Sequence, residues 1–209
     1  EYRKILEDLE KQDINYWRIY GLGQWGKLTN LVYSNWKIVE DFPMQRSNVI
    51  YGLDFGFNNP SALLKLYIDG SEVGIEEKIY ATGLTTTDLI SKMEEAIPKE
   101  HRQSHPIYAD NAEPDRILEI NNAGFWCLPC HKVSVTEGID DVKQFQIYSL
   151  SSNTQYNKEV KTYSWRQDKN DRILDEAVKY NDHYMDAMRY ALSTYVRQNL
   201  MGRPRIREL

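Results

Sequence analysis

The sequence lacks long hydrophobic runs and has few cysteines. No stretch of about 18 apolar residues occurs, so we expect no transmembrane helix and no membrane partner. The first residues, Glu1-Tyr2-Arg3-Lys4 and onward, contain no apolar signal-peptide centre. These absences predict a soluble, intracellular protein. The chain begins without Met and within a helical pattern, which indicates a piece of a longer polypeptide.

The sequence also lacks an excess of basic residues. It has 26 Lys and Arg against 31 Asp and Glu, for a formal net charge of -5. A protein that coats nucleic acid gains affinity by neutralising many phosphates, so this balance argues against such a role. It does not exclude a nuclease, because a site for divalent cations concentrates carboxylates and the bound cations reverse the local charge.

Length and composition predict one main globular domain. With 209 residues, 41% of them hydrophobic and 12% aromatic, the chain can form a substantial core. Residues 1–45 have the character of an arm, in which a short helix at Tyr2–Lys11 precedes irregular chain rich in aromatic residues and glycine. We expect the regular elements of the domain in residues 46–197 and a basic tail in residues 198–209.

Hydrophobic periodicity within the domain predicts an α/β fold. Residues Val49 to Asn58 alternate bulky apolar side chains with small or polar ones, which is the period of a strand. Turn residues then predict two more strands in an antiparallel meander. The elements expected after the first strand are strands at 62–68 and 73–80, a helix from Thr85 to Ile97, a strand at 106–110, a helix at 114–124, a strand at 125–128, a helix at 137–150, a strand or extended segment at 156–165, a polar loop at 167–175 and a helix at 180–196.

Three aspartates occupy positions where a buried strand or core helix does not ordinarily carry a charge. Asp54 lies in an apolar strand, Asp110 ends a strand, and Asp186 lies on a face of the last helix. Carboxylate oxygens are the ligands that Mg²⁺ prefers, and the glycines on either side of Asp54 leave its strand face open. Two such ions, about 3.5–4 Å apart, can stabilise both the attacking and the leaving oxygen of a phosphodiester. The alternative for each aspartate is a cap, a turn residue or a surface charge.

These aspartates lie in three segments whose order and spacing carry a resemblance. The segments are Tyr51-Gly52-Leu53-Asp54-Phe55-Gly56, Tyr108-Ala109-Asp110-Asn111-Ala112-Glu113-Pro114 and His183-Tyr184-Met185-Asp186-Ala187-Met188-Arg189-Tyr190. Together they resemble the acidic motifs of the nuclease domain of tailed-bacteriophage terminase large subunits, over residues Val49 to Val196. Leu22-Gly23-Gln24-Trp25-Gly26 resembles the join between the ATPase and nuclease domains of that family.

The resemblance implies a ribonuclease-H-like fold, with a mixed sheet of three antiparallel strands plus parallel strands flanked by helices. It implies that Asp54, Asp110 and Asp186 hold two divalent ions, Mg²⁺ or Mn²⁺. The implied activity is endonuclease cleavage of double-stranded viral DNA concatemers during genome packaging. The implied partners are double-stranded DNA, the portal protein, the small terminase subunit and an ATPase domain upstream on the same polypeptide. The implied location is the host cytoplasm and, transiently, the portal of the prohead.

Two further residues match the pattern of that family. His183 lies one turn before Asp186 on the same helix face, where it is a candidate for supporting the second metal or the scissile phosphate. Asp182, four residues before Asp186, competes for that role, and a packing or surface histidine is the alternative. Lys132 follows a strand and a proline as in the family, which makes it a candidate phosphate contact, with a solvated surface lysine as the alternative.

Two other motifs fit their consensus only in part. Residues 21–27 match the first part of a phosphate-binding loop, but Leu28 stands where Ser or Thr is needed for Mg²⁺. Cys127-Leu128-Pro129-Cys130-His131 fits the pattern of haem attachment or a redox dithiol, yet no signal peptide is present and three ligands are too few for a structural zinc site. We expect both cysteines to be reduced structural residues.

The sequence leaves competing functions open. The nearest is another ribonuclease-H-like nuclease of the resolvase or integrase type, which substrate preference would separate. A non-catalytic module that docks on the portal is a different class, in which the aspartates are structural. A redox or haem protein is a third class, and a visible absorption spectrum with a thiol titration would identify it.

Overall fold

The computed structural model describes residues 30–168, 170 and 172–202. The arm helix expected at Tyr2–Lys11 and the motif at 21–27 lie outside these residues. Within the described part, seven strands form one mixed sheet in the order β1-β7-β4-β3-β2-β5-β6, and two more form a separate hairpin. The strands are β1 (Trp36–Val39), β2 (Val49–Asp54), β3 (Ser61–Asp69), β4 (Glu72–Ala81), β5 (Ile107–Ala109), β6 (Cys127–Pro129), β7 (Gln146–Leu150), β8 (Trp165–Gln167) and β9 (Ile173–Ala177).

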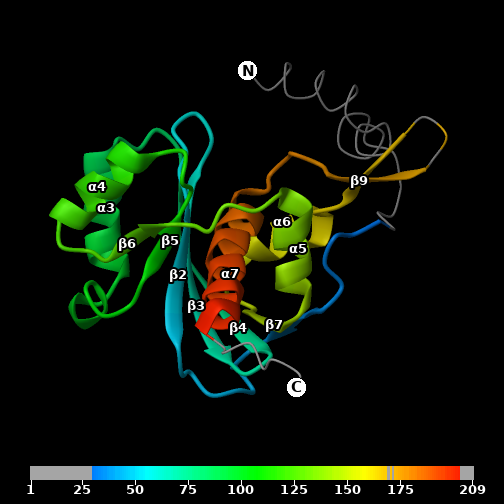
Figure 1. Cartoon of the computed structure of the whole chain (residues 1–209), viewed down its shortest axis with the longest axis horizontal. Helices are drawn as coiled ribbons and strands as arrows, with labels where there is room; N and C mark the ends of the chain where they lie inside the picture. Colours follow the sequence, from blue (N-terminus) through cyan, green and yellow to red (C-terminus); the bar gives the residue numbers. More distant parts are fainter. Residues whose placement is uncertain (1–29, 169, 171, 203–209) are drawn as a thin grey trace, which may run out of the picture.

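Helices pack on both faces of the sheet (Figure 1). They are α3 (Thr86–Ala96), the short 3₁₀ helix η2 (Lys99–His101), α4 (Pro114–Asn122), α5 (Val135–Lys143), α6 (Thr154–Thr162) and α7 (His183–Gly202). No helix of the described residues has both the length and the hydropathy needed to cross a membrane.

The sheet is built around an antiparallel meander. β3 runs antiparallel to both β2 and β4, and Gly70, with a φ of 59°, occupies the tight turn between β3 and β4. β5 and β6 extend the sheet in parallel beyond β2, while β7 and β1 extend it in parallel beyond β4. The expected three antiparallel strands plus parallel strands are therefore confirmed.

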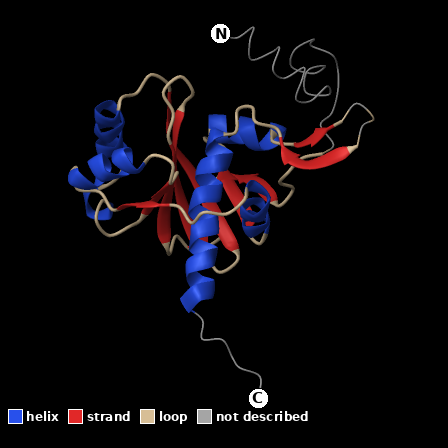
Figure 2. Ribbon diagram, turned by 45° about the horizontal axis from the view of Figure 1, so that its top comes forward, coloured by secondary structure: helices blue, strands red, loops and turns tan. Residues whose placement is uncertain are grey.

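The two faces of the sheet have separate hydrophobic cores. Alternation along β2 turns Tyr51 and Leu53 toward the core that contains α3 and α4. Ile50 faces the other core, where the long helix α7 crosses the sheet (Figure 2) and both α5 and α6 pack against it. Because side chains on a strand alternate, Gly52 and Asp54 face α7 as well.

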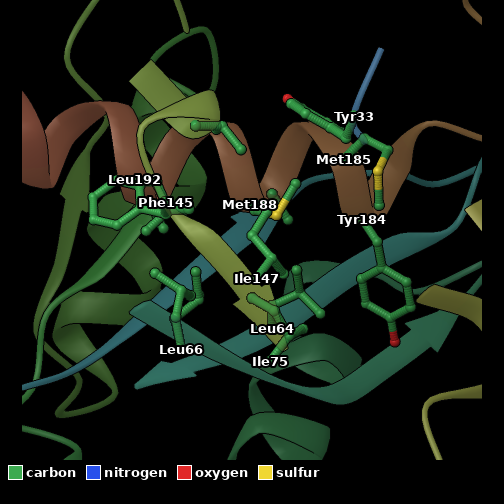
Figure 3. Packing of buried hydrophobic residues seen from close by; sticks show 14 of the residues in the cluster. Tyr33, Leu64, Leu66, Ile75, Phe145, Ile147, Tyr184, Met185, Met188 and Leu192 are labelled. Atoms are coloured by element: carbon green, nitrogen blue, oxygen red, sulfur yellow. The ribbon is translucent and has the colours of Figure 1, made fainter. Parts of the chain in front are cut away.

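The last helix supplies the expected apolar stripe. Met185, Met188 and Leu192 recur at i, i+3 and i+7 and are fully buried. Figure 3 shows these side chains directed at sheet residues such as Leu64 and Ile147. The helix is therefore held to the sheet by apolar packing along its length, which fixes the position of the polar residues that it carries.

Local capping sets where several helices begin. Thr85 and Ser134 each form a capping box, in which the side chain accepts a hydrogen bond from the backbone N–H of Asp88 or Glu137, respectively. Pro114 occupies the first turn of α4, where its missing N–H has no cost. The expected starts at Thr85 and Pro114 are confirmed.

The first strand is shorter than expected. It ends at Asp54, whereas the alternation suggested Asn58. Gly56 turns the chain here: its N–H donates to the Ser61 hydroxyl, and that hydroxyl donates to the Gly56 carbonyl at 2.8 Å. A Cβ at Gly56 would collide with the backbone of Asn59 and Pro60, so this turn needs glycine.

The helix expected at 137–150 is wrong in its second half. α5 ends at Lys143, and β7 begins at Gln146. Ile147 and Ser149 in β7 are buried between β1 and β4, while the alternate residues Gln146, Tyr148 and Leu150 are partly exposed. The period of the apolar residues therefore changes from that of a helix to that of a strand, and no proline or glycine lies between Lys143 and Gln146 to mark the boundary.

The strand or extended segment expected at 156–165 is wrong for most of its length, because residues 154–162 form α6. Tyr156 and Val160 lie four residues apart on its buried face. A tertiary contact caps this helix, since the Glu77 carboxylate accepts hydrogen bonds from the N–H groups of Thr154, Gln155 and Tyr156, each at 3.0 Å.

Three other segments are more regular than expected. The polar loop at 167–175 overlaps the β8–β9 hairpin. The arm contains β1, which pairs with β7, and the buried side chains Val32 and Tyr33. α7 continues to Gly202, into the segment expected as a tail. The domain boundaries at 45/46 and 197/198 stay predictions.

Candidate active site

Asp54 ends the central strand β2 and faces α7. It is only 9% exposed. A Cβ at Gly52, two residues earlier on the same strand face, would collide with the carbonyl oxygen of Ala187 in α7. The missing side chain lets α7 approach the strand closely, so that the residue beside Ala187, Asp186, is brought to the end of β2.

Asp110 reaches the same edge of the sheet from the neighbouring strand. β2 and β5 are parallel, and Leu53 pairs with Ala109, so Asp54 and Asp110 follow at adjacent positions of the two strands. The N–H of Ala112 donates to Oδ1 of Asp110 at 3.1 Å, which holds the carboxylate in a turn before α4. The parallel strands therefore bring together two residues that are far apart in the sequence.

His183 contacts Asp54 directly. Its Nδ1 donates a hydrogen bond to Oδ2 of Asp54 at 3.1 Å. Burial alone would lower the pKa of His183, but the hydrogen bond to Asp54 and the charges of Asp54 and Asp182 raise it overall. The imidazole is thus held against the aspartate of β2.

The carboxylates repel one another. Burial raises the pKa of Asp54 to about 6, and the charges of Asp186 and Asp110 add to this increase, while the hydrogen bond from His183 opposes it. Burial and the charge of Asp186 also raise the pKa of Asp182. The site therefore concentrates negative charge that a bound cation would stabilise.

The donor atoms fit a hard divalent cation. Asp54, Asp110 and Asp186 each use one carboxylate oxygen in a hydrogen bond, to His183, Ala112 and Arg189 respectively. The other oxygen of each has no hydrogen bond in the described structure, and such oxygens are the ligands of Mg²⁺ and Mn²⁺. No group of three or more His, Cys, Asp or Glu side chains among the described residues is already close enough to form a complete metal site.

Arg189 holds the third aspartate. The Nη2 of Arg189 donates a hydrogen bond to Oδ1 of Asp186 at 2.7 Å. This hydrogen bond and the charge of Asp186 raise the pKa of Arg189, although burial opposes the increase. A Cβ at Gly138 of α5 would collide with the alkyl chain of Arg189. The arginine therefore lies in a slot that α5 leaves open, and its identity as a positioning residue is not evident from its place in the sequence.

Glu159 and Tyr80 form a buried group beside the site. Glu159 accepts hydrogen bonds from the Tyr80 hydroxyl at 2.7 Å and from the N–H of Tyr184 at 2.7 Å. Burial raises the pKa of Glu159 to about 7. Glu159 was not identified as a candidate from the sequence, because a strand or extended segment was expected at 156–165. Read as a helix, that segment places a glutamate on the same face as Tyr156 and Val160, which is the signal that could have identified it.

The remaining candidates lie apart from the carboxylates. Lys132 is exposed in the loop between β6 and α5, and no contact joins it to the aspartates in the described structure. Cys127 and Cys130 are both buried free thiols, and burial raises the pKa of each. Their burial agrees with the expected structural role, because a buried thiol with a raised pKa is a poor nucleophile.

Known proteins share this sequence pattern and this fold. Residues 54–194 match the family described as the terminase RNAseH like domain. The PBSX phage terminase large subunit of Bacillus subtilis (strain 168) is 24% identical to the chain over an alignment of 209 positions, which covers 93% of this chain and 47% of that protein. The chain therefore spans about half the length of this curated relative.

Two solved structures give the fold. The nuclease domain of the large terminase g2p from bacteriophage SPP1, solved with bound Mn, has a TM-score of 0.68 and 19% identity, and the likeness covers 80% of this chain and 99% of that one. The large terminase of a thermophilic bacteriophage, solved in complex with ATP-gamma-S, has a TM-score of 0.65 and 20% identity over 92% of this chain and 52% of that one.

These likenesses confirm the mixed α/β ribonuclease-H-like sheet flanked by helices. Because their sequence identities to the chain are 19% and 20%, the two structures establish the fold alone. The family match is a match of sequence, and it extends from Asp54 to beyond Asp186. Because that match covers more than half of the sequence, the chain belongs to the terminase RNAseH like domain family.

Proposed function

We propose that this chain is a divalent-metal-dependent endonuclease that cuts double-stranded viral DNA during genome packaging. The observation that carries the proposal is the convergence of Asp54, Asp110 and Asp186 from β2, β5 and α7 at one edge of the sheet. The structure of the SPP1 nuclease domain with bound Mn supports the use of such an ion. Relatives that are large terminases support a link to an upstream ATPase domain.

Each side chain has a task in this proposal. The three aspartates would hold two Mg²⁺ or Mn²⁺ ions, which when bound supply charge stabilisation to the attacking and leaving oxygens of the phosphodiester. His183 orients Asp54 through Nδ1 and can hold a proton near the reacting atoms. Arg189 orients Asp186. Lys132, exposed on a loop, would contact a more distant DNA phosphate.

Cleavage should show little base-sequence preference. Specificity for sequence requires side chains that read base edges in a groove, and the chain has no motif of that kind. The further proposed partners are the portal protein and the small terminase subunit, with the chain in the host cytoplasm and transiently at the portal of the prohead.

The direct test is incubation of the chain with supercoiled plasmid in Mg²⁺ or Mn²⁺, with parallel reactions in excess EDTA. We expect nicked and linear products only with metal. Asp54→Ala should remove the activity, whereas Asp140→Ala, which changes an exposed aspartate of α5, should retain it. Cutting in EDTA, or cutting by Asp54→Ala at the normal rate, would show that the proposal is wrong, and absence of cutting by the folded chain would favour the docking module.

A further inference from the structure

A cavity of about 540 Å³ opens beside the candidate active site. Its wall is formed by Pro60 in the turn before β3, Tyr80 near the end of β4, one side of α6, and Tyr180 and Asn181 before α7. None of the aspartates of the site lines it. It is therefore a separate compartment, and its chemistry is not used by the proposed hydrolysis.

The cavity shares a wall with the site. The centroids of the Tyr80 and His183 rings lie 6.2 Å apart, and His183 is hydrogen-bonded to Asp54. The Tyr80 hydroxyl is fixed by its hydrogen bond to Glu159, so this ring has a defined position between the two compartments. Asn181 lies only two residues before His183. A molecule in the cavity would thus be next to the atoms that act on a phosphodiester.

The lining suits a flat, partly polar ring system. Tyr80, Tyr180 and Pro60 supply broad apolar surfaces, and aromatic side chains stack on any nucleobase because every base has a π-face. Gln155 supplies a side-chain amide, which can donate to and accept from the edge of a base. The combination of ring surfaces with a few polar groups is typical of a pocket for a small planar ligand.

Two lysines stand at the rim of the same cavity. Lys158 and Lys161 are exposed on α6 at i and i+3, so their side chains lie on one face of the helix. Neither forms an ion pair in the part of the chain that the structure describes. In a site that otherwise concentrates carboxylates, these ammonium groups offer the positive charge that a phosphate backbone requires.

We propose that this cavity, the nucleotide pocket, takes one unpaired nucleotide of the DNA strand that the neighbouring carboxylates cut. The inference rests on the proposed nuclease function and specifies its substrate. The volume lies in the range of small-ligand sites, roughly 300–1,000 Å³, and a base that is still paired within a duplex cannot enter such a space. The base stacks on the tyrosines, and the two lysines contact the phosphates on either side.

The pocket predicts a preference for locally opened DNA. Moving a base out of a duplex costs stacking and pairing energy, and that cost is smallest at a mismatch or a site that is already single-stranded. The chain should therefore cut next to a mismatch faster than at the same position in a fully paired duplex, by at least about fivefold. The preference should not depend on which base is unpaired.

The test compares two labelled duplexes of one sequence, fully paired or with one central mismatch, in Mn²⁺. Tyr180→Ala and the double variant Lys158→Ala/Lys161→Ala should each lower the ratio of the two cleavage rates to about one. Tyr180→Phe keeps the ring and should keep the ratio. Lys179→Ala, a nearby exposed lysine that does not line the pocket, is the matched control and should behave as the unmodified chain. The lysine variant changes only exposed side chains, so it decides the question even if Tyr180→Ala does not fold.

A second measurement separates the pocket from the nuclease. The fluorescence of 2-aminopurine at the mismatch is followed in excess EDTA as the chain is added, and stacking on the pocket should change it for the unmodified chain but not for Tyr180→Ala. Equal cleavage of the two duplexes, with no fluorescence change, overturns the pocket while leaving the nuclease intact. A fluorescence change without any metal-dependent cutting supports the pocket and overturns the proposed nuclease.

Discussion

The two faces of the central sheet bury different kinds of side chain. On one face, the α3 face, the helices α3 and α4 bury only Leu89, Met93, Ile117 and Ile120. On the other, the α7 face, the helices α5, α6 and α7 bury two carboxylates, one amide and an arginine among their apolar residues. Burying polar groups has a cost unless each finds a partner, so a helix layer that carries many of them serves more than packing.

The polar residues of the α7 face form specific hydrogen bonds. Asp141 of α5 accepts from the Ser193 hydroxyl at 2.7 Å and from Nε of Arg197 at 3.0 Å. Glu159 of α6 accepts from the N–H of Tyr184 at the start of α7. Because hydrogen bonds are directional, they fix the rotation of α7 about its axis and its position along that axis more precisely than apolar contacts do. The helix α7 carries Asp186 and His183. The comparison therefore assigns structural support to one face and the candidate chemistry to the other.

The largest expected effect is the loss of cleavage when a carboxylate of the site is changed. Asp54→Asn, Asp110→Ala and Asp186→Ala should each lower plasmid cleavage at least about 100-fold, because charge stabilisation in the transition state is lost. Melting temperature in EDTA should not fall for Asp54→Asn, since burial and neighbouring charges disfavour the ionised form of this residue. Near-normal turnover in any one of the three would remove that residue from the site.

A matched pair of core substitutions tests the division between the faces. Met93 in α3 and Met188 in α7 are both fully buried, and truncation of either to alanine should lower the free energy of unfolding by about 2–5 kcal/mol. Met93→Ala should retain the cleavage rate per folded molecule, whereas Met188→Ala should lower it, because α7 positions Asp186.

Urea unfolding supplies the stability values for this pair, and cleavage is measured well below the melting temperature of the weaker variant. An equal loss of cleavage in both variants would show that the α3 face contributes to the site, and the contrast between the faces would then not hold.

His183 gives a smaller effect within the α7 face. His183→Ala should lower cleavage at least about tenfold, a loss of about 1.4 kcal/mol in transition-state stabilisation, with little change in melting temperature. His183→Asn can still donate to Asp54 from its side-chain amide but cannot titrate. If the role of His183 is only to orient Asp54, Asn restores activity; if it is proton transfer, Asn does not, and the pH profile of the residual activity changes. A variant with full activity and reduced stability would identify a packing residue.

The last expected effect concerns stability and not cleavage, and it is the pH dependence of unfolding without metal. The pKa of Glu159 is raised from 4.5 to about 7 by burial, so between these values the folded state holds a proton that the unfolded state has lost. Stability should therefore fall as pH rises from about 5 to about 7, by up to about 1.4 kcal/mol per pH unit from this group. Asp54, with a pKa of about 6, acts in the same direction.

Glu159→Gln isolates this contribution. Urea unfolding of the unmodified chain and the variant, in EDTA at several pH values, should give a shallower slope for the variant. An unchanged slope would mean that Glu159 stays ionised in the folded protein and that other groups of the α7 face cause the dependence.

Much of the α3 face was predictable from the sequence, for a physical reason. Its helices begin at local capping signals at Thr85 and Pro114, and their apolar residues follow one period. The meander was predictable as well, because the alternation along β2 and the turn at Gly70 are local. The three aspartates stood out because each carried a charge into an element whose pattern was otherwise apolar.

The α7 face was harder to predict, because its elements depend on distant partners. Residues 154–162 form a helix whose first N–H groups bond to Glu77 in β4, about 77 positions earlier in the chain. Gln146–Leu150 is a strand because β1 and β4 provide partners on both of its edges. No local pattern contains these partners, and so the sequence alone indicated the wrong elements there.

The sequence by itself determined which residues carry the candidate chemistry: the charges of Asp54, Asp110 and Asp186, their order, and the period of the elements that hold them. Only the tertiary structure decided how they meet. Parallel pairing of β2 with β5 aligns Asp54 with Asp110, and the missing side chain of Gly52 lets α7 approach closely enough to bring Asp186 and His183 to the same edge. Local chemistry selects residue types and elements, but distances between separate elements are set by packing, which involves the whole chain.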